Sequence, residues 1–554
     1  MADSVEPEFD PEAWKRMGFS ERVRFSCEAF VRGGIGYPPA VYIFHAVKLG
    51  LFVLGWIFFC SFTPGLVDPL NFGAWIFDGI AFQKAFIWAS LVEVAGFACT
   101  SGPLGGRFAP PFTAYWHFLR PGTVKLAPFP KLPLFGGDKR TWLDVVLYAG
   151  LLASLVRALI ASEIGASELI PIVVLLPLCG LGDKTILLAA RVEHHFAMLL
   201  CFLLAGEWIA ASKWVQLAIW FWAGVSKLTV AFPYVVPIMT ANNPMLKSQA
   251  VRQRLFVSPP DNVNPSTLAR LMAHAGGFLE FAAPLTLVFV TGDGPLLYLG
   301  LFWVVMLHGF ILSNVPLAAV FEWNVLSVYS GFFLFFAHPE VSLFAVGSAP
   351  LSLYLIAALL VLPLIGNLMP SKVSFLVAMR YYAGNWAWNA WLFKGEAYER
   401  LACFTRASKI AREQLAETMP AADALRADAG VMAFRTMHLQ GRVLGLVLPQ
   451  AIGDAAFQEY TYVDGEQVAA SLLGWNFGEG HLANERLLEI VQAHCGFEEG
   501  ELRTIHVEAQ PLLGSSLHWR VADASTGQID EGYAELSELA KRDPWAVGHI
   551  QQTV

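Results

Sequence analysis

Charged residues are scarce in this chain, and their scarcity excludes an ordinary soluble globule. Only 15% of the 554 residues are Asp, Glu, Lys or Arg, and 56% are apolar, whereas an average soluble domain is about 25% charged. Mean hydropathy is correspondingly high, at +0.51. The net charge of -8 and the lack of a basic tract also argue against nucleic acid as a partner.

Cysteine pairs and a secretory leader are also lacking. The seven cysteines are scattered, with no CxxC pair and no spacing typical of a zinc site or a disulfide framework, so we expect them to be buried small hydrophobic residues. The first 25 residues lack the apolar core of a signal peptide and precede a full-length apolar run. We therefore expect insertion into a membrane through internal helices.

Long apolar runs fill most of the chain, as expected of an α-helical polytopic membrane protein. They predict about ten spans, near residues 39–63, 80–100, 143–161, 168–190, 193–212, 214–238, 266–291, 294–313, 317–337 and 341–366. Lys and Arg gather before the first run and in the even-numbered connections, and short basic loops face the cytoplasm. The sequence thus predicts an integral membrane protein with both termini cytoplasmic.

The predicted organisation has four parts. Residues 1–38 form an N-terminal cytoplasmic or interfacial segment, and residues 39–370 form the membrane domain. The stretch 371–398 is rich in Trp and Tyr and predicts an interfacial amphipathic helix. Residues 399–554 predict a soluble α+β domain, with a helical part over 399–425, strands at QEYTYV, RTIHVEA and LHWRVADAS, and a helix at NERLLEIVQAHCGF.

Ionisable residues lie within the predicted spans, where each charge costs about 2.5 kcal/mol or more and needs a partner, water or a function. They are His45, Glu93, Arg157, Glu207, Lys227, His274, Glu280, His308 and Glu322. Lys227 has about ten apolar or small residues on either side, so burial would depress its pKa and make it a usable general base. The alternative is an internal ion pair with Glu207 or Glu280.

Histidines accompany these charges. His195 and His274 could be core histidines with satisfied hydrogen bonds, which is the commoner fate of a single histidine, yet His274 and Glu280 share one run of small residues. No HxxxH or HxxE pair lies on one helix face, and His194 adjoins His195 and points away from it. We therefore predict no metal site.

Two polar regions lie outside the spans. The connector over 101–142 is basic and rich in Gly and Pro; it could hold anionic headgroups or a carboxylate, although simple topology explains its charge better. In the soluble part, Asn476, Glu479 and His481 have the residue types of a ligand site, but a Gly-rich turn followed by a helix cap is the favoured interpretation.

The order of several short motifs resembles the membrane domain of vitamin K-dependent gamma-carboxylase and of its bacterial relatives, the horizontally transferred transmembrane (HTTM) proteins. The resemblance covers about 180–335, and its motifs are DKT (183–185), EHH (193–195), AGVSKL (223–228), RLF (254–256), HAGGFLEFAAPLTLVF (274–289) and LHGFILSNVP (307–316). It implies a divergent member of this superfamily in a bacterial inner membrane.

The resemblance also implies roles for particular residues. Lys227 matches the lysine that deprotonates a hydroquinone in the carboxylase, and Ser226 stands where that enzyme has another lysine. His195, His274 and His308 match its histidines, and His194, Trp222 and Glu280 are the residues we expect around a vitamin K-like quinone or hydroquinone. The small soluble domain differs from the carboxylase's large β-rich part, which argues against carboxylation of peptide glutamate.

The leading hypothesis is a membrane-embedded, carboxylase-like enzyme. Lys227 would be the base for quinone-linked or oxygen-linked modification of a lipid or other apolar substrate, and the histidines would orient the reacting group. A transporter or lipid-binding protein with a cytoplasmic accessory domain is the alternative, against which stands the absence of an inverted repeat. A third hypothesis is a scaffold whose soluble domain recruits partners.

Overall fold

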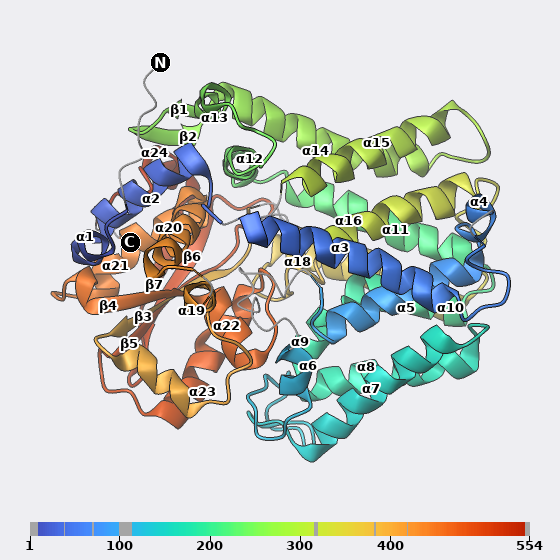
Figure 1. Ribbon diagram of the computed structural model, residues 1–554, viewed down its shortest axis with the longest axis horizontal. Coiled ribbons are helices and arrows are strands. Elements are labelled where there is room, and N and C mark those ends of the chain that lie inside the picture. Colours follow the sequence, from blue (N-terminus) through green and yellow to red (C-terminus); the bar gives the residue numbers. More distant parts are fainter. Residues whose placement is uncertain are drawn as a thin grey trace.

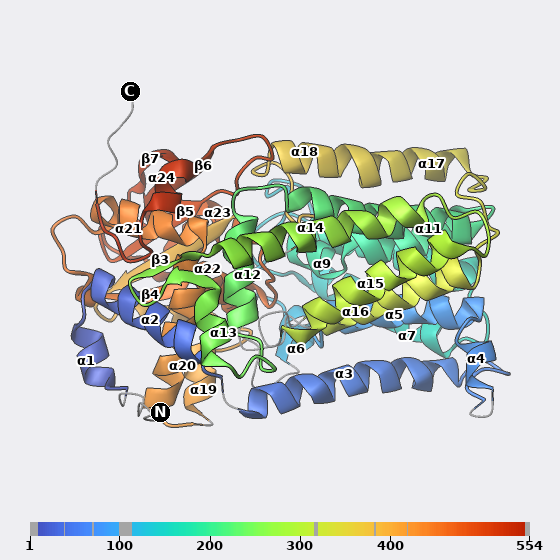
Figure 2. The ribbon, with the colours of Figure 1, turned by 90° about the horizontal axis from the view of Figure 1, so that it is seen from above.

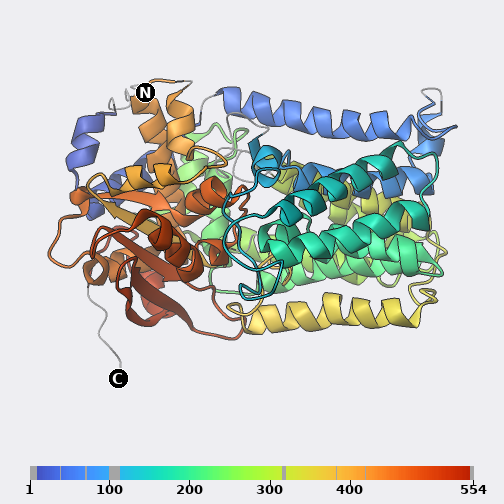
Figure 3. The ribbon, with the colours of Figure 1, turned by 90° about the horizontal axis from the view of Figure 1, so that it is seen from below.

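A long helical bundle and a sheet domain at one end of it make up the molecule (Figure 1). The computed structural model describes residues 9–37, 39–68, 71–98, 113–314, 320–381, 384–417 and 419–548. Cys99, Arg107 and the first part of the basic connector lie outside the described residues. Both ends of the described chain lie at the sheet-domain end of the bundle (Figures 2 and 3).

The bundle helices lie where the apolar runs predicted helices. They are α3 (Pro39–Cys60), α5 (Gly79–Val94), α7 (Trp142–Ile160), α8 (Ala166–Gly182), α10 (Ala197–Leu204), α11 (Trp208–Ser226), α14 (Thr267–Leu287), α15 (Pro295–Ser313), α16 (Phe321–Gly331), α17 (Ala349–Ile356) and α18 (Leu362–Leu368). A π-helix, η3 (Val192–Phe196), leads into α10, and two others, η4 (Phe332–Phe336) and η5 (Ala357–Val361), extend α16 and join α17 to α18.

Shorter elements connect the bundle helices. They are α4 (Phe72–Trp75), α6 (Thr113–Phe118), α9 (Lys184–Ala189), α12 (Phe232–Ala241), α13 (Gln249–Arg254) and the hairpin of β1 (Phe256–Ser258) with β2 (Asn262–Pro265).

Among the described residues, four helical stretches are long and apolar enough to cross a membrane: Pro39–Cys60, Trp142–Ile160, Pro295–Ser313 and Ala349–Leu368. The expected number of about ten spans is not established. Some of the other bundle helices, such as Ala166–Gly182 and Val192–Leu204, are too short, and others are too polar. On α3, Ile43, Leu51 and Leu54 are each more than 60% exposed. α3 and the α17–α18 pair lie on opposite edges of the bundle, where such apolar surface would face lipid (Figure 2).

The sheet domain contains five antiparallel strands in the order β4-β3-β5-β6-β7. Their bounds are β3 (Trp388–Lys394), β4 (Tyr460–Asp464), β5 (Leu502–Val507), β6 (Ser516–Asp523) and β7 (Gly527–Glu535). The helices of this domain are α19 (Ala411–Ala416), α20 (Ala421–Met437), α21 (Leu439–Ile452), α22 (Gly465–Leu473), α23 (Glu485–Cys495) and α24 (Leu536–Lys541). The three predicted strands and the helix after Asn484 are confirmed.

The prediction of an interfacial helix over 371–398 is wrong. The described part of this stretch contains no α-helix: residues 388–394 form β3, which is flanked by β4 and β5, and a 3-10 helix begins only at Ala397. Trp388, Trp391 and Phe393 are buried within the domain, so these aromatic rings fill a protein core and not a headgroup layer. The sheet domain therefore begins before residue 399.

The N-terminal segment belongs to the sheet domain as well. Helix α1 (Pro11–Arg16) precedes α2 (Phe19–Gly33), which packs along α20. Phe19 packs edge-on against Phe457, with ring centroids 5.4 Å apart, and Cys27 is fully buried. The segment that the sequence assigned to the cytoplasm or the interface is thus part of a packed core.

Two further expectations concern the basic connector and the cysteines, and the second needs correction in part. Within the described part of the basic connector, Lys125 and Arg140 are fully buried and pair with Asp144 and Asp183, so neither is free to hold a headgroup. Four of the described cysteines are buried as expected, but Cys403 is exposed and Cys495 partly exposed.

Candidate functional site

Lys227 lies at the end of α11 and pairs with a carboxylate of α14. Its Nζ is 2.7 Å from Glu280 Oε2, and the two side chains are only 8% and 5% exposed. The ammonium also donates hydrogen bonds to the carbonyl oxygens of Ala223, at 3.2 Å, and Tyr381, at 3.0 Å. Lys227 therefore has the buried acidic partner that the ion-pair alternative requires, so that alternative describes this residue better than the neutral base does. The other candidate partner, Glu207, caps the far end of α11.

Tyr381 connects this pair to a second buried pair. Its hydroxyl donates to Glu193 Oε1 and accepts from Arg191 Nη2, both at 2.8 Å. Arg191 Nε also donates to Glu193, at 2.9 Å. The backbone of Arg191 is left-handed, with φ 50° and ψ 62°, a conformation that is strained for a residue other than glycine. Sequence reasoning missed Arg191, Glu193 and Tyr381 as a unit, because the tyrosine lies nearly 190 residues further along the chain.

His194 and His195 follow Arg191 in the π-helix η3. Both imidazoles are buried, with ring centroids 5.2 Å apart, and both meet the edge of Phe86. His194 lies against Gln216 of α11. Neither ring nitrogen of His195 has a hydrogen-bond partner among the described residues. A buried polar group without a partner is costly, and such groups concentrate where a ligand or a reaction needs them.

The remaining predicted site residues are engaged elsewhere. Both ring nitrogens of His308 are satisfied, since Nε2 accepts from Trp220 at 2.9 Å and Nδ1 lies 2.7 Å from Asn324 Oδ1. Trp222 donates to the carbonyl of Leu359 at 2.7 Å. His274 is exposed, whereas Glu280 lies among the buried residues of α14. The structure therefore brings Lys227 and Glu280 together and leaves His274 on the exposed surface.

A second polar cluster lies in the sheet domain, at the Asn476, Glu479 and His481 that the sequence singled out. The backbone N–H of Glu479 donates to Asn476 Oδ1 at 3.2 Å, and Glu479 Oε1 lies 2.7 Å from His481 Nδ1. The other oxygen of Glu479 accepts the N–H of Phe375, at 3.0 Å. This turn therefore fastens the segment after α18 to the sheet domain.

Two residues at the end of β5 complete the cluster, and sequence reasoning missed both. Glu508 Oε2 lies 2.9 Å from His481 Nε2, and Glu508 Oε1 lies 2.8 Å from His506 Nε2. Residues two apart on an extended chain share one face, so the HVE sequence could have indicated that His506 and Glu508 act together. The ligand-capable atoms of His481, His506 and Glu508 all lie within 4.8 Å of one another.

The electrostatics of this cluster follow from its pairing. Burial lowers the pKa of His481, but hydrogen bonds and charge interactions with Glu479 and Glu508 outweigh burial and raise it to about 9. Burial raises the pKa of Glu508, but hydrogen bonds to the two imidazoles hold it well below its usual range. Arg520 pairs with Glu485 at 2.6 Å and reaches Glu508 at 3.4 Å.

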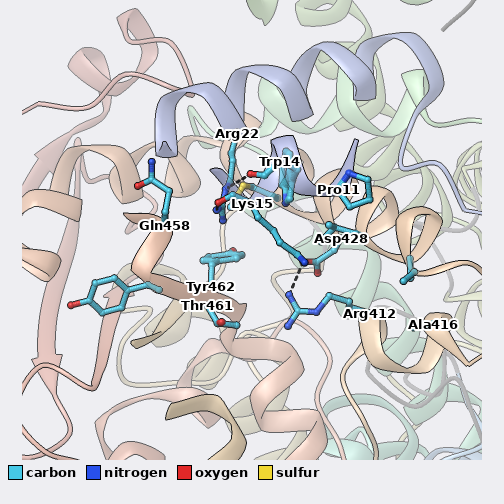
Figure 4. A pocket seen from close by; sticks show the side chains of 15 residues that line it. Pro11, Trp14, Lys15, Arg22, Arg412, Ala416, Asp428, Gln458, Thr461 and Tyr462 are labelled. Carbon is cyan, nitrogen blue, oxygen red and sulfur yellow. Dashed lines mark hydrogen bonds and ion pairs between the residues drawn. The ribbon is translucent and has the colours of Figure 1, made fainter. Parts of the chain in front are cut away.

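A third feature is a hollow of about 510 Å³ between the N-terminal helices and the α19, α20 and β4 region (Figure 4). Arg412 and Asp428 form an ion pair across it at 3.5 Å, and the buried hydroxyl of Tyr462 has no hydrogen-bond partner among the described residues. Burial raises the pKa of Asp428, and Arg412 opposes that shift. This hollow lies within the sheet domain and does not reach the Lys227–Glu280 pair.

Apolar helices with outward apolar surface and a sheet domain fastened to one end of them define an integral membrane protein. The chain belongs to the family described as transmembrane protein of unknown function (DUF3556), whose model matches residues 2–554. No curated protein and no solved structure matches the chain. The resemblance to the gamma-carboxylase superfamily therefore stays a prediction.

Proposed function

We propose that this protein is a membrane-embedded enzyme that begins its reaction by moving a proton from an apolar or lipid substrate to the Lys227–Glu280 pair. The observation that supports it is the pair itself, a lysine and a glutamate 2.7 Å apart and both buried. Ionisable groups are costly inside a bilayer, and replacing a buried ion pair by apolar residues is often neutral or stabilising. A stability requirement alone thus gives a weak reason for its presence.

The pairing divides the chemistry between two residues. In this proposal the Glu280 carboxylate accepts the proton of a substrate hydroxyl, and the Lys227 ammonium stabilises the oxygen anion that remains. The lysine thus acts as the positive partner, a change from the base role that the carboxylase resemblance implies. Its donors to Ala223 and Tyr381 fix the ammonium in place.

The proposed substrate class is an apolar molecule with an ionisable hydroxyl, of which a hydroquinone is the simplest example. The ring of Phe232 lies 5.6 Å from the Lys227 ammonium and adds an aromatic surface beside the pair. His195 adds two ring nitrogens without partners among the described residues in the neighbouring η3 segment. We also propose a bacterial inner membrane as the location, with both termini in the cytoplasm.

The test follows the absorption spectrum of 1,4-naphthohydroquinone under anaerobic conditions with the full chain in lipid nanodiscs. Bound hydroquinone should ionise at lower pH than the free molecule, because the pair accepts its proton and stabilises its anion. Glu280→Gln and Lys227→Met should each abolish that shift. Lys213→Met is the matched control, since Lys213 lies on the same helix, is buried, and within the described residues donates to the carbonyls of His338 and Val341 and to no carboxylate.

Two results would contradict the proposal. One is a naphthohydroquinone spectrum that the wild-type protein leaves unchanged. The other is an ionisation shift that survives both Glu280→Gln and Lys227→Met. Mass spectrometry of co-purified molecules gives an independent check, because a stoichiometric polar solute in place of an apolar one would favour transport.

A further inference from the structure

Two imidazoles and one carboxylate point at one another in the sheet domain, and we propose that His481, His506 and Glu508 form a binding site for one divalent transition-metal ion. The Nε2 atoms of both histidines face the same carboxylate, at 2.9 Å and 2.8 Å. This proposal depends only on the sheet domain and is independent of the chemistry proposed for Lys227 and Glu280.

The spacing suits coordination. A metal ion bound about 2.0–2.2 Å from each of three nitrogen or oxygen ligands holds those ligands about 3–3.5 Å apart. The ligand-capable atoms of the cluster lie within 4.8 Å of one another, and its two nitrogen–oxygen distances, each to a different oxygen of Glu508, are 2.9 Å and 2.8 Å.

The outer nitrogens of both imidazoles are held by acceptors, which is the arrangement typical of metal-binding histidines. His481 Nδ1 lies 2.7 Å from Glu479 Oε1, and His506 Nδ1 is hydrogen-bonded to Asn389 Oδ1. These contacts fix each ring so that its Nε2 points into the cluster. The Glu479 carboxylate is itself fixed by the N–H of Phe375, and the backbone N–H of Glu479 donates to Asn476 Oδ1.

The ligand set indicates the class of ion. Imidazole nitrogens favour zinc, iron, cobalt and related ions over Mg²⁺ and Ca²⁺, which prefer oxygen ligands. Arg520 is paired with Glu485, at 2.6 Å, so its positive charge is already neutralised. The negative charges of Glu508 and Glu479 therefore remain to balance a divalent cation. His481 is 17% exposed whereas His506 and Glu508 are almost fully buried, so the open coordination position lies on the His481 side.

The test is a titration of Co²⁺ into the full chain, purified without a histidine tag and stripped with a chelator. We expect one equivalent of Co²⁺ to bind with visible d–d absorption, and Zn²⁺ to displace it. His481→Ala, His506→Ala and Glu508→Gln should each abolish the absorption. Glu479→Gln, which removes the negative charge of the outer hydrogen-bond partner, should weaken binding about 10–100-fold.

The control is His494→Ala, because His494 lies in the same domain, contacts the carbonyl of Ile490 and has no part in the cluster. It should bind Co²⁺ as the wild type does. The thermal midpoint of each variant without metal shows whether that variant is folded. If a variant of one of the three ligands does not fold, the weaker binding expected of Glu479→Gln still tests the proposal. Wild-type protein that binds no Co²⁺, or binding that Glu508→Gln and Glu479→Gln both leave unchanged, would overturn the proposal.

Discussion

Phe477 of the sheet domain packs edge-on against Trp323 of α16, with ring centroids 4.9 Å apart and ring planes at 74°. The same Trp323 ring lies 3.6 Å from the guanidinium of Arg191, and its Nε1 donates to Glu93. One aromatic side chain therefore contacts the sheet domain and two buried charges of the bundle. The two parts of the molecule are thus coupled through this ring.

We expect that coupling to be measurable as non-additivity. Phe477→Ala and Trp323→Leu should each lower the thermal midpoint, and the double variant should lose less than the sum of both. Edge-to-face aromatic pairs contribute about 0.5–1.5 kcal/mol beyond burial, which sets the size of the difference. Phe477→Ala combined with Trp391→Phe, a core change within the sheet domain, should be additive. Strictly additive losses for Phe477→Ala and Trp323→Leu would show that the ring contact carries no coupling.

The buried Arg191 should matter far more to stability than an exposed arginine of the same bundle. Arg191→Met leaves Glu193 as an uncompensated buried carboxylate, and breaking such a pair costs about 3–5 kcal/mol. Arg157→Met is the matched control, because Arg157 is 54% exposed and its pair with Glu168 should contribute at most about 1 kcal/mol. Denaturation of the detergent-solubilised variants measures both, and equal losses would contradict this account.

Hydropathy predicted where the bundle helices lie, because an apolar run in a membrane has to satisfy its backbone hydrogen bonds within one helix. It failed at β3, whose residues Trp388 to Phe393 are buried on both faces. A strand flanked on both sides within a core has no alternation of polar and apolar residues, so its aromatic content resembled that of an interfacial helix. β7 was missed for the opposite reason: it is an edge strand, largely exposed and rich in charge.

The candidate site was predicted in part. Glu280 was one of two partners considered for Lys227, because both lie in apolar runs, but only the packing of α11 against α14 selects it over Glu207. In the sheet domain, the turn near Glu479 and His481 was visible in the sequence as a dense polar stretch. Its partners on β5 were not, since the register of a sheet brings residues together across long separations that no local pattern records.

Gly480 should tolerate no side chain. A Cβ at this position would lie 2.0 Å from the carbonyl oxygen of Ala387, which belongs to the main chain and cannot turn aside. Gly480→Ala should therefore destabilise the sheet domain by about 1–3 kcal/mol. Gly18→Ala is the control, since its Cβ would meet only the side-chain nitrogen of Gln458, at 3.8 Å. A thermal midpoint for Gly480→Ala equal to that of the control would show that the turn can move.

Asp428 should make the stability of the sheet domain depend on pH. Burial raises its pKa above the ordinary value of 3.8, so the folded state binds a proton more tightly than the unfolded state does. The resulting penalty is absent below pH 3.8, grows as the pH rises towards the folded-state pKa, and is complete at neutral pH. Asp428→Asn keeps the shape of the side chain and removes the charge. It should raise the thermal midpoint at pH 7 and lose that advantage near pH 4.

The same comparison with Arg412 separates this effect from the ion pair. Arg412 is the group that opposes the shift, at 3.5 Å from Asp428, so Arg412→Met should lower the thermal midpoint at pH 7 and leave it nearly unchanged near pH 4. In the double variant, Arg412→Met should cost less than it does alone, because no buried carboxylate is left to compensate. If Asp428→Asn instead lowers the midpoint at pH 7, the attraction of Arg412 exceeds the cost of burial, and the sign of the pH dependence is reversed.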